Sequence, residues 1–348
     1  MRFSINHDTG DSIRGWIAPD NPLAISRVVV SIGGRRVAEV AASESHEEFV
    51  KAGWHSTGQC IFQLTDAEVP GLAMTPRLEL YDSDTNVLVY RRLPEDSVLP
   101  QRVILLNTSV RQDVGLEAAL FPFFRQSYFN LHKLPEDTLS NILGDRILTS
   151  CLLSGGVGVP RYEHFFADRG IMTAMLVSDP YVEMATRLLW LQSRSESAAD
   201  PANRWRYGTL AESAAFTAAY DFTDAKSIKR FLRMLPEPAY RLLYNPLTRQ
   251  LGIRMPDDNL GPGNSIVAIE VLARIDVIGH ASRYDAFVAT LFDRIGVEPK
   301  VVTPPGVSDR TLALADRLRG VREATEMIVF DRAIAEAVEN SVARVWTA

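Results

Sequence analysis

The segment AMLVSDPYVEMATRLLWL, residues 174–191, puts a polar break between two apolar runs. The first run is of strand type, and from Pro180 onward the apolar spacing is helical. Ser178 or Asp179 can cap that helix, and Pro180 suits its first turn, where no backbone N–H is needed. A helix that starts at the carboxyl end of a parallel strand also presents free N–H groups that can bind an anion. The segment is therefore either an ordinary helix cap or part of an anion site.

Other side chains that could do chemistry occur singly. His164 in RYEHFF is a candidate general base or an ordinary residue at a packed helix start, and His280 is expected to be a satisfied polar residue at a strand end. The pair Asp257-Asp258 lies in a Pro/Gly loop with no partnering His, so it is weak as a metal site. Residues 154–160, SGGVGVP, are rich in Gly but lack the Lys-Ser/Thr of a P-loop. We expect no metal.

Composition limits the class of protein. The chain has 348 residues, 46% of them hydrophobic and 23% charged, which predicts a globular protein of two domains. A net charge of −6 argues against a general nucleic-acid binder. No signal-peptide core and no apolar run long enough to span a bilayer is visible, and Cys60 and Cys151 are expected to be buried thiols. We expect a cytoplasmic protein without a transmembrane segment.

Residues 1–92 consist of short strand-like runs separated by turns. RVVVSIGG ends in a Gly-Gly turn, and RLELYDSDTNVLVYRR has two alternating runs around a polar turn, as in a hairpin. We expect an antiparallel β-sandwich over 1–92, with Trp16 and Trp54 packed in its core rather than stacked on sugar rings. Residues 93–101, which contain two prolines, are expected to be a linker.

Residues 102–348 alternate between strands and helices. RVILLN (102–107) and GIMTAMLV (170–177) predict buried strands, and IEVLARIDVIGH (269–280) is a further strand candidate. Helical spacing follows at 114–124 and 180–194, and later over 308–346. The alternation predicts an α/β domain with a mainly parallel sheet.

Several stretches of this region together resemble the PAPS-dependent carbohydrate sulfotransferases. LVSDPYVEMATRLLW (176–190) is similar to their 3′-phosphate segment, which reads Leu-Arg-Asp-Pro with a Ser eight residues after the Arg. RVILLNTSVRQDVGLEAAL (102–120) stands where the family binds the 5′-phosphosulfate, and NPLTRQLG (245–252) resembles its Asn-x-x-Thr-Arg-x-Leu element. Residues 275–296 and 322–342 are similar to later elements of bacterial members, and residues 13–40 resemble a Gly-Trp β-sandwich module found ahead of such domains.

The resemblance implies a P-loop-like sulfotransferase fold, PAPS as co-substrate and a carbohydrate or lipid-linked sugar as acceptor. In the family, backbone N–H groups and a Lys hold the 5′ end of the nucleotide, and an Arg and a Ser hold the 3′-phosphate. Carried onto this chain, the roles are catalytic for Arg111 and His164, cofactor-binding for Ser109, Arg111, Gly115, Ser178 and Thr186, and substrate-binding for Arg249.

The chain also departs from the family pattern. Ser178 replaces the Arg that binds the 3′-phosphate, and Gly156 stands where many relatives have His. Thr186 keeps the hydroxyl but can equally bond its own helix backbone, and Arg187 points about 100° away from it. Asp113 adds a negative charge where a phosphate would bind.

Two hypotheses of different class follow. In the first, the protein transfers sulfate from PAPS to a hydroxyl of a surface glycan. In the second, it is a catalytically inactive protein of the sulfotransferase fold that acts as a binding or scaffolding protein in polysaccharide biosynthesis. The retained Asp-Pro, Thr186 and NPLTRQLG favour a ligand pocket, whereas the departures favour the second hypothesis.

Overall fold

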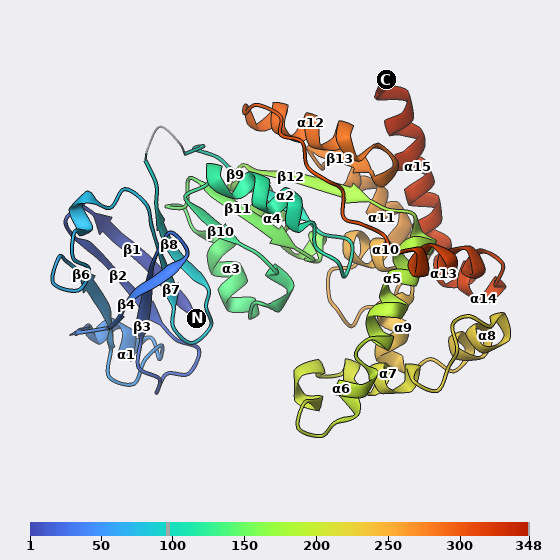
Figure 1. Cartoon of the computed structure of the whole chain (residues 1–348), viewed down its shortest axis with the longest axis horizontal. Helices are drawn as coiled ribbons and strands as arrows, with labels where there is room; N and C mark the ends of the chain where they lie inside the picture. The colour runs from blue at the N-terminus through green and yellow to red at the C-terminus, as the bar shows by residue number, and fades with distance from the viewer. Residues whose placement is uncertain (95–97, 347–348) are drawn as a thin grey trace. The chain divides into compact units, whose positions relative to one another are not determined.

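The computed structural model describes residues 1–94 and 98–346 (Figure 1). Of the expected linker 93–101, residues 95–97 lie outside the described residues. The chain forms two compact units. The first comprises Met1–Ile104, Leu120–Ser154 and Phe165–Ile171, and the second comprises Leu105–Ala119, Gly155–His164 and Met172–Ala348.

The N-terminal region forms two antiparallel four-stranded sheets, with strand orders β1-β2-β6-β5 and β4-β3-β7-β8. Their strands are β1 (Arg2–Asp8), β2 (Ile13–Ala18), β3 (Arg27–Ile32), β4 (Arg35–Ala41), β5 (Glu44–Ser45), β6 (Gln59–Leu64), β7 (Leu78–Asp82) and β8 (Leu88–Arg92), with a short helix α1 (Glu47–Lys51) and a 3-10 turn η1 (Leu72–Met74). The hairpin expected within 77–92 is confirmed as β7 and β8. Strands β1 and β2 fall within the strand-like region expected over 1–92, although no separate run was predicted for either of them.

The Gly-Trp pair of β2, Gly15 and Trp16, has a structural reason at each of its two positions. A Cβ on Gly15 would lie 2.7 Å from the backbone oxygen of Ser4, so only glycine allows β1 to pair this closely. The Trp16 ring stacks on Trp54 at 5.9 Å between centroids and packs against Phe49. Both tryptophans are partly buried and pack against the cluster of Ala18, Phe49 and Cys60, rather than lying inside the core as expected.

The chain also forms a five-stranded parallel sheet with the strand order β10-β11-β9-β12-β13. Its strands are β9 (Arg102–Leu106), β10 (Gln126–Tyr128), β11 (Cys151–Gly155), β12 (Ile171–Val177) and β13 (Val277–His280). All five residues of β9 are buried, as expected of a parallel strand covered on both faces. The chain is thus a mixed α/β protein, and the strands predicted at 102–107 and 170–177 are confirmed.

The strand candidate 269–280 is wrong in its first half. Residues 269–272 belong to helix α11 (Pro262–Leu272), and only Val277–His280 form a strand. Ala268, Val271 and Leu272 are buried, whereas Ile266 and Ile269 are exposed. The apolar run therefore follows the helical period, which periodicity alone does not separate from a buried strand.

The helices of the later chain and the remaining short turns have the following bounds: α2 (Val114–Leu120), η3 (Phe121–Phe123), η4 (Leu131–Lys133), α3 (Glu136–Gly144), α4 (Val159–Asp168), α5 (Pro180–Gln192), α6 (Ser195–Ala199), η5 (Arg204–Tyr207), α7 (Leu210–Thr217), α8 (Ala225–Arg233), α9 (Glu237–Leu243), α10 (Pro246–Gly252), η6 (Ala281–Arg283), α12 (Tyr284–Ile295), α13 (Asp309–Arg319), α14 (Arg322–Met327) and α15 (Val329–Val345). The helical stretch expected over 308–346 is therefore three helices. Over the described residues, none of the helices combines the length and apolar composition needed to cross a bilayer.

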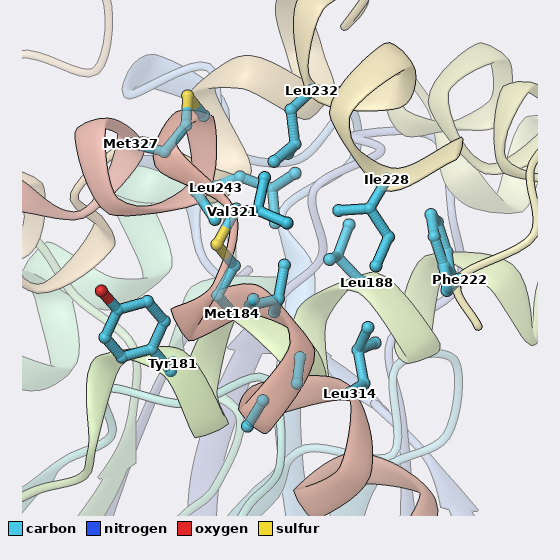
Figure 2. Close-up of a cluster of buried hydrophobic side chains, with 14 of the residues drawn as sticks. Tyr181, Met184, Leu188, Phe222, Ile228, Leu232, Leu243, Leu314, Val321 and Met327 are labelled. Atoms are coloured by element: carbon cyan, nitrogen blue, oxygen red, sulfur yellow. The ribbon is translucent and has the colours of Figure 1, made fainter. Parts of the chain in front are cut away.

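Helix α5 leaves the end of β12 and carries the main core of the second unit. Its Met184 and Leu188 pack against Ile228 of α8, Leu243 of α9 and Leu314 of α13 (Figure 2). Met184 is 1% exposed and Leu188 is fully buried, so this face of α5 is fixed by apolar contacts on several sides. Because α5 starts at Pro180, this packing also fixes the junction that follows β12.

The two cysteines are buried free thiols, as expected. Burial raises the pKa of the Cys151 thiol to about 12, so it is an unreactive thiol in the folded protein.

Phe231→Ala tests this core. The Phe231 ring is fully buried and lies 5.1 to 5.7 Å from the rings of Phe216, Tyr220 and Phe222. We expect the substitution to lower the free energy of unfolding by about 3–5 kcal/mol, measured by urea denaturation. Met234→Ala, at a 62% exposed side chain nearby, should change it by less than about 0.5 kcal/mol. Equal effects of the two substitutions would contradict this account of the core.

Candidate functional site at the strand ends

The junctions that follow β9 and β12 lie side by side. The two strands are neighbours in the sheet, and the Thr108 hydroxyl donates a hydrogen bond to the Leu176 carbonyl at 3.1 Å. Carboxyl ends of parallel strands are where ligands bind in open α/β sheets. This region of the second unit is therefore the candidate site.

In the loop after β9, side chains of the loop itself accept hydrogen bonds from its backbone N–H groups. Asn107 Oδ1 accepts the N–H of Ser109 at 3.0 Å, and Ser109 Oγ accepts the N–H of Arg111 at 3.1 Å. Asp113 Oδ1 then accepts the N–H of Leu116 at 2.9 Å, in the first turn of α2. The amides expected to cradle a phosphate are thus partly occupied by groups of the same loop.

Asp113 is held from a second side as well. The Tyr284 hydroxyl donates to Asp113 Oδ2 at 2.6 Å. Burial, together with this bond to a carboxylate, raises the pKa of Tyr284, so the phenol stays protonated as the donor. The Asp113 carboxylate is therefore fixed at the start of α2, where the helix dipole favours an anion.

The junction after β12 is an ordinary helix cap. Asp179 Oδ1 accepts the N–H groups of Tyr181 at 2.8 Å and of Val182 at 3.1 Å, and Pro180 occupies the first turn. Asp179 Oδ2 accepts from Arg319 of α13 at 2.7 Å. Both oxygens of this carboxylate are thus engaged within the protein. Ser178, next to it, is half-buried.

The side chains of Thr186 and Arg187 both form hydrogen bonds within the protein. The Thr186 hydroxyl donates to the Val182 carbonyl of its own helix at 2.8 Å, which is the backbone alternative left open by the sequence. Arg187, 9% exposed, pairs with Glu183 at 2.6 Å and donates to the Thr108 carbonyl at 2.7 Å. Its guanidinium therefore links α5 to the loop after β9 instead of standing free for a phosphate.

The remaining predicted site residues occupy different settings. Arg111 and Gly115 are exposed on the loop and in the first turn of α2, and His164 is exposed on α4. Arg249 of α10 is half-buried; its Nη1 donates to the Asp258 carbonyl at 3.3 Å, and burial lowers its pKa. The Nε of Arg249 is buried with no hydrogen-bond partner within the described residues.

Gln250, which was not among the predicted site residues, contacts the candidate site. Its amide donates to the Asn107 carbonyl at 3.1 Å, so α10 contacts the end of β9 through Gln250 and not through Arg249. The Gly-rich segment after β11 lies beside it: the Gly155 carbonyl accepts the N–H of Asn107, and a Cβ on Gly156 would lie 3.4 Å from the Asn107 carbonyl oxygen. The absence of side chains here allows this close approach of backbones.

The element NPLTRQLG is held by an exchange of caps with α15. Asp331 accepts the N–H groups of Leu247 at 3.0 Å and of Thr248 at 2.7 Å, and the Thr248 hydroxyl at 2.6 Å. In return, Asn245 Oδ1 accepts the N–H groups of Phe330 at 2.8 Å and of Asp331 at 3.2 Å. Burial raises the pKa of the Asp331 carboxyl, while the donors from Thr248 and Leu247 oppose that rise. Each helix start is thus satisfied by a residue of the other.

His280 is a buried acceptor at the end of β13. Its Nδ1 lies 2.8 Å from the Ser282 hydroxyl and accepts the Ser282 N–H at 3.3 Å. Burial lowers the pKa of His280, and the nearby carboxylates of Glu339 and Asp179 oppose this only in part. The neutral ring is therefore the form that fits the fold, as expected of a satisfied polar residue.

No family model, curated protein or solved structure matches the chain. The site must therefore be interpreted from its own contacts.

Asp331→Asn tests the exchange of caps. The amide keeps one acceptor oxygen but turns its N–H groups toward one of the two donors, Leu247 or Thr248, so that donor loses its partner. We expect the free energy of unfolding to fall by about 1–3 kcal/mol in urea denaturation. Asp293→Asn, at an exposed position of α12, serves as the control and should change it by less than about 0.5 kcal/mol. An equally small effect at Asp331 would contradict a structural role.

His280→Gln tests the buried imidazole by pH. Because the folded pKa of His280 is lowered, its contribution to stability is present above the unfolded pKa and lost as pH falls below it. We expect wild type to lose more stability than His280→Gln between about pH 7 and about pH 5, measured by thermal unfolding. His7→Gln, at an exposed position, should keep the wild-type dependence. Identical pH profiles for wild type and His280→Gln would refute the assignment.

Proposed function

We propose that this chain is a sulfotransferase-like protein that does not transfer sulfate and instead acts as a binding or scaffolding protein in surface-polysaccharide assembly. One observation carries the proposal. At both candidate junctions, a carboxylate of the same chain already accepts the helix N–H groups that a phosphate would use: Asp113 at α2 and Asp179 at α5.

Electrostatics supports the same conclusion. Two like charges 4 Å apart near a protein surface repel by about 4 kcal/mol, and a bisphosphorylated nucleotide would bring several negative charges close to Asp113. Asp179 repels less, because Arg319 pairs with it at 2.7 Å. Among the predicted nucleotide-binding residues, the only cation is Arg111, which is exposed. An exposed ion pair contributes about 0–1 kcal/mol, too little to offset that repulsion. Arg187 does not compensate, because Glu183 neutralises its charge at 2.6 Å.

A role in binding accounts for what the junctions do retain. The loop after β9 is tied to the end of β12 through Thr108, to the middle of α5 through Arg187, and to α10 through the bond between Gln250 and Asn107. These bonds make a fixed polar surface at the strand ends, and fixed surfaces suit recognition, since little entropy is lost on binding.

A second candidate function is sulfate transfer from PAPS to a glycan hydroxyl. The adjacency of the two junctions, with Thr108 bonded to Leu176 at 3.1 Å, favours it, since the family reaction needs both nucleotide ends at one place. In that case Arg111 would stabilise charge on the leaving phosphate and His164 would take the acceptor proton.

Calorimetric titration with adenosine 3′,5′-bisphosphate at moderate salt separates the two. We expect no binding heat from the wild type at millimolar ligand. Asp113→Asn and Asp179→Asn keep an acceptor oxygen for the helix start while removing the charge, so the double variant should bind more tightly than wild type.

Two results would overturn the proposal. Micromolar binding by the wild type that disappears in Arg111→Ala, but persists in Arg344→Ala, would overturn the proposal in favour of the transferase. Arg344 is a matched control because it is an exposed arginine at the far end of α15. Transfer of labelled sulfate from PAPS to a polysaccharide acceptor by the wild type would also overturn it.

A further inference from the structure

We propose that a hollow in the first unit binds a sugar ring. The hollow has a volume of about 510 Å³, and its lining includes Tyr81, Phe121, Ser127, Phe129, Asn130 and Lys133. Small-molecule sites typically measure about 300–1,000 Å³ and combine apolar walls with a few placed polar groups. This inference goes beyond the proposed function, because none of these residues belongs to the strand-end junctions of the second unit.

The apolar wall is made of aromatic rings held in fixed positions. The rings of Phe121 and Phe129 lie 6.1 Å apart and are tilted by 42°. The Arg91 guanidinium lies 3.7 Å from the centre of the Phe121 ring, and its Nη1 donates to the Phe121 carbonyl at 2.7 Å. Arg91 itself pairs with Glu79, so the ring is anchored from behind.

The tilt of these rings favours a puckered ligand over a flat one. A planar heterocycle binds best between parallel ring faces, which Phe121 and Phe129 do not offer. A pyranose ring carries C–H groups with small positive charge on both faces, and these suit the negative faces of tilted aromatic rings.

A buried hydroxyl supplies the second, independent observation. Ser127 is 3% exposed, and its Oγ has no hydrogen-bond partner within the described residues. Burying an unpaired hydroxyl costs free energy, so such a group needs an explanation. Ser127 lines the hollow, and because its Oγ is buried, a ligand hydroxyl supplies the missing bond after a small shift of the neighbouring side chains.

The other polar groups of the hollow suit a ligand rich in hydroxyls. Asn130 has a left-handed backbone with φ of 58°, and its side chain does not cap the 3-10 turn η4 that it precedes. Its amide offers both donors and an acceptor, and Lys133 offers donors. Asp20 offers one acceptor oxygen, since its Oδ1 already accepts from the N-terminal ammonium of Met1. Sugar hydroxyls both donate and accept, so they match this mixture better than an apolar or purely anionic ligand does.

Saturation-transfer NMR on the full chain tests the inference. The probes are the methyl glycosides of glucose, galactose, mannose and glucuronic acid at millimolar concentration. We expect saturation of the protein to transfer to the ring C–H protons of at least one glycoside. Transfer to none of the four would overturn the proposal.

Matched serine variants make the test specific. Ser127→Ala and Ser213→Ala each remove a buried hydroxyl that has no partner in the described part of the chain, but Ser213 lies in α7 of the second unit. Both variants should keep or raise the midpoint of thermal unfolding. Only Ser127→Ala should weaken glycoside binding, by about fivefold.

A second pair of variants tests the lysine that lines the hollow. Lys133→Met should also weaken binding, whereas Lys226→Met, at an exposed lysine of α8, should not. Equal binding by Ser127→Ala and wild type, or equal losses in Ser127→Ala and Ser213→Ala, would overturn the site. Neither result bears on nucleotide binding, so failure here leaves the proposed function standing.

Discussion

The N–H groups at the start of a helix have no partner within the helix, and this requirement organises the second unit. Asp113, Asp179, Asn245 and Asp331 each satisfy such groups, at α2, α5, α15 and α10. Two of these caps, Asp113 and Asp179, are also held from a further element, by Tyr284 of α12 and Arg319 of α13. The caps therefore do more than end helices: they fix how neighbouring segments meet at the ends of the strands.

This constraint bears directly on function. A helix start binds a phosphate only when its N–H groups are free, and a carboxylate in that place removes the donors and adds a repelling charge. Arg187 illustrates the same point from the cationic side, since Glu183 and two backbone carbonyls take up its guanidinium. Groups that could have served a nucleotide are used here to join α5, α9 and the loop after β9. This internal pairing of charge links the three segments at the junction, which supports the proposal that no nucleotide phosphate binds there.

The sequence predicted the architecture better than the site. Buried strands such as β9 and β12 could be recognised because their apolar runs are short, β-branched and followed by polar breaks. Residues 269–272 could not be assigned correctly, since a short apolar run fits both a buried strand and a helix. Asp179-Pro180 was recognisable as a cap, because cap and first-turn residues act within one short segment.

The candidate site was less predictable, because its contacts join distant parts of the chain. Arg187 reaches Thr108 and Gln250 reaches Asn107 across 79 and 143 positions, and no local pattern encodes such pairs. The residues of NPLTRQLG were noticed for a resemblance to a catalytic family, yet Asn245 and Thr248 bond to α15. A polar residue in a recognisable motif can thus owe its place to folding, and only its partners distinguish the two roles.

The exchange of caps between Asn245 and Asp331 has a consequence for the order of events during synthesis. The two residues are 86 positions apart in the chain, so the start of α10 lacks its acceptors until α15 has left the ribosome. Contacts between distant segments form late, because closing a long loop costs entropy before any bond repays it. A nascent chain that stops short of Asp331 would therefore leave the region around Asn245 unfinished, and the second unit would mature only once the segment of α15 has been synthesised.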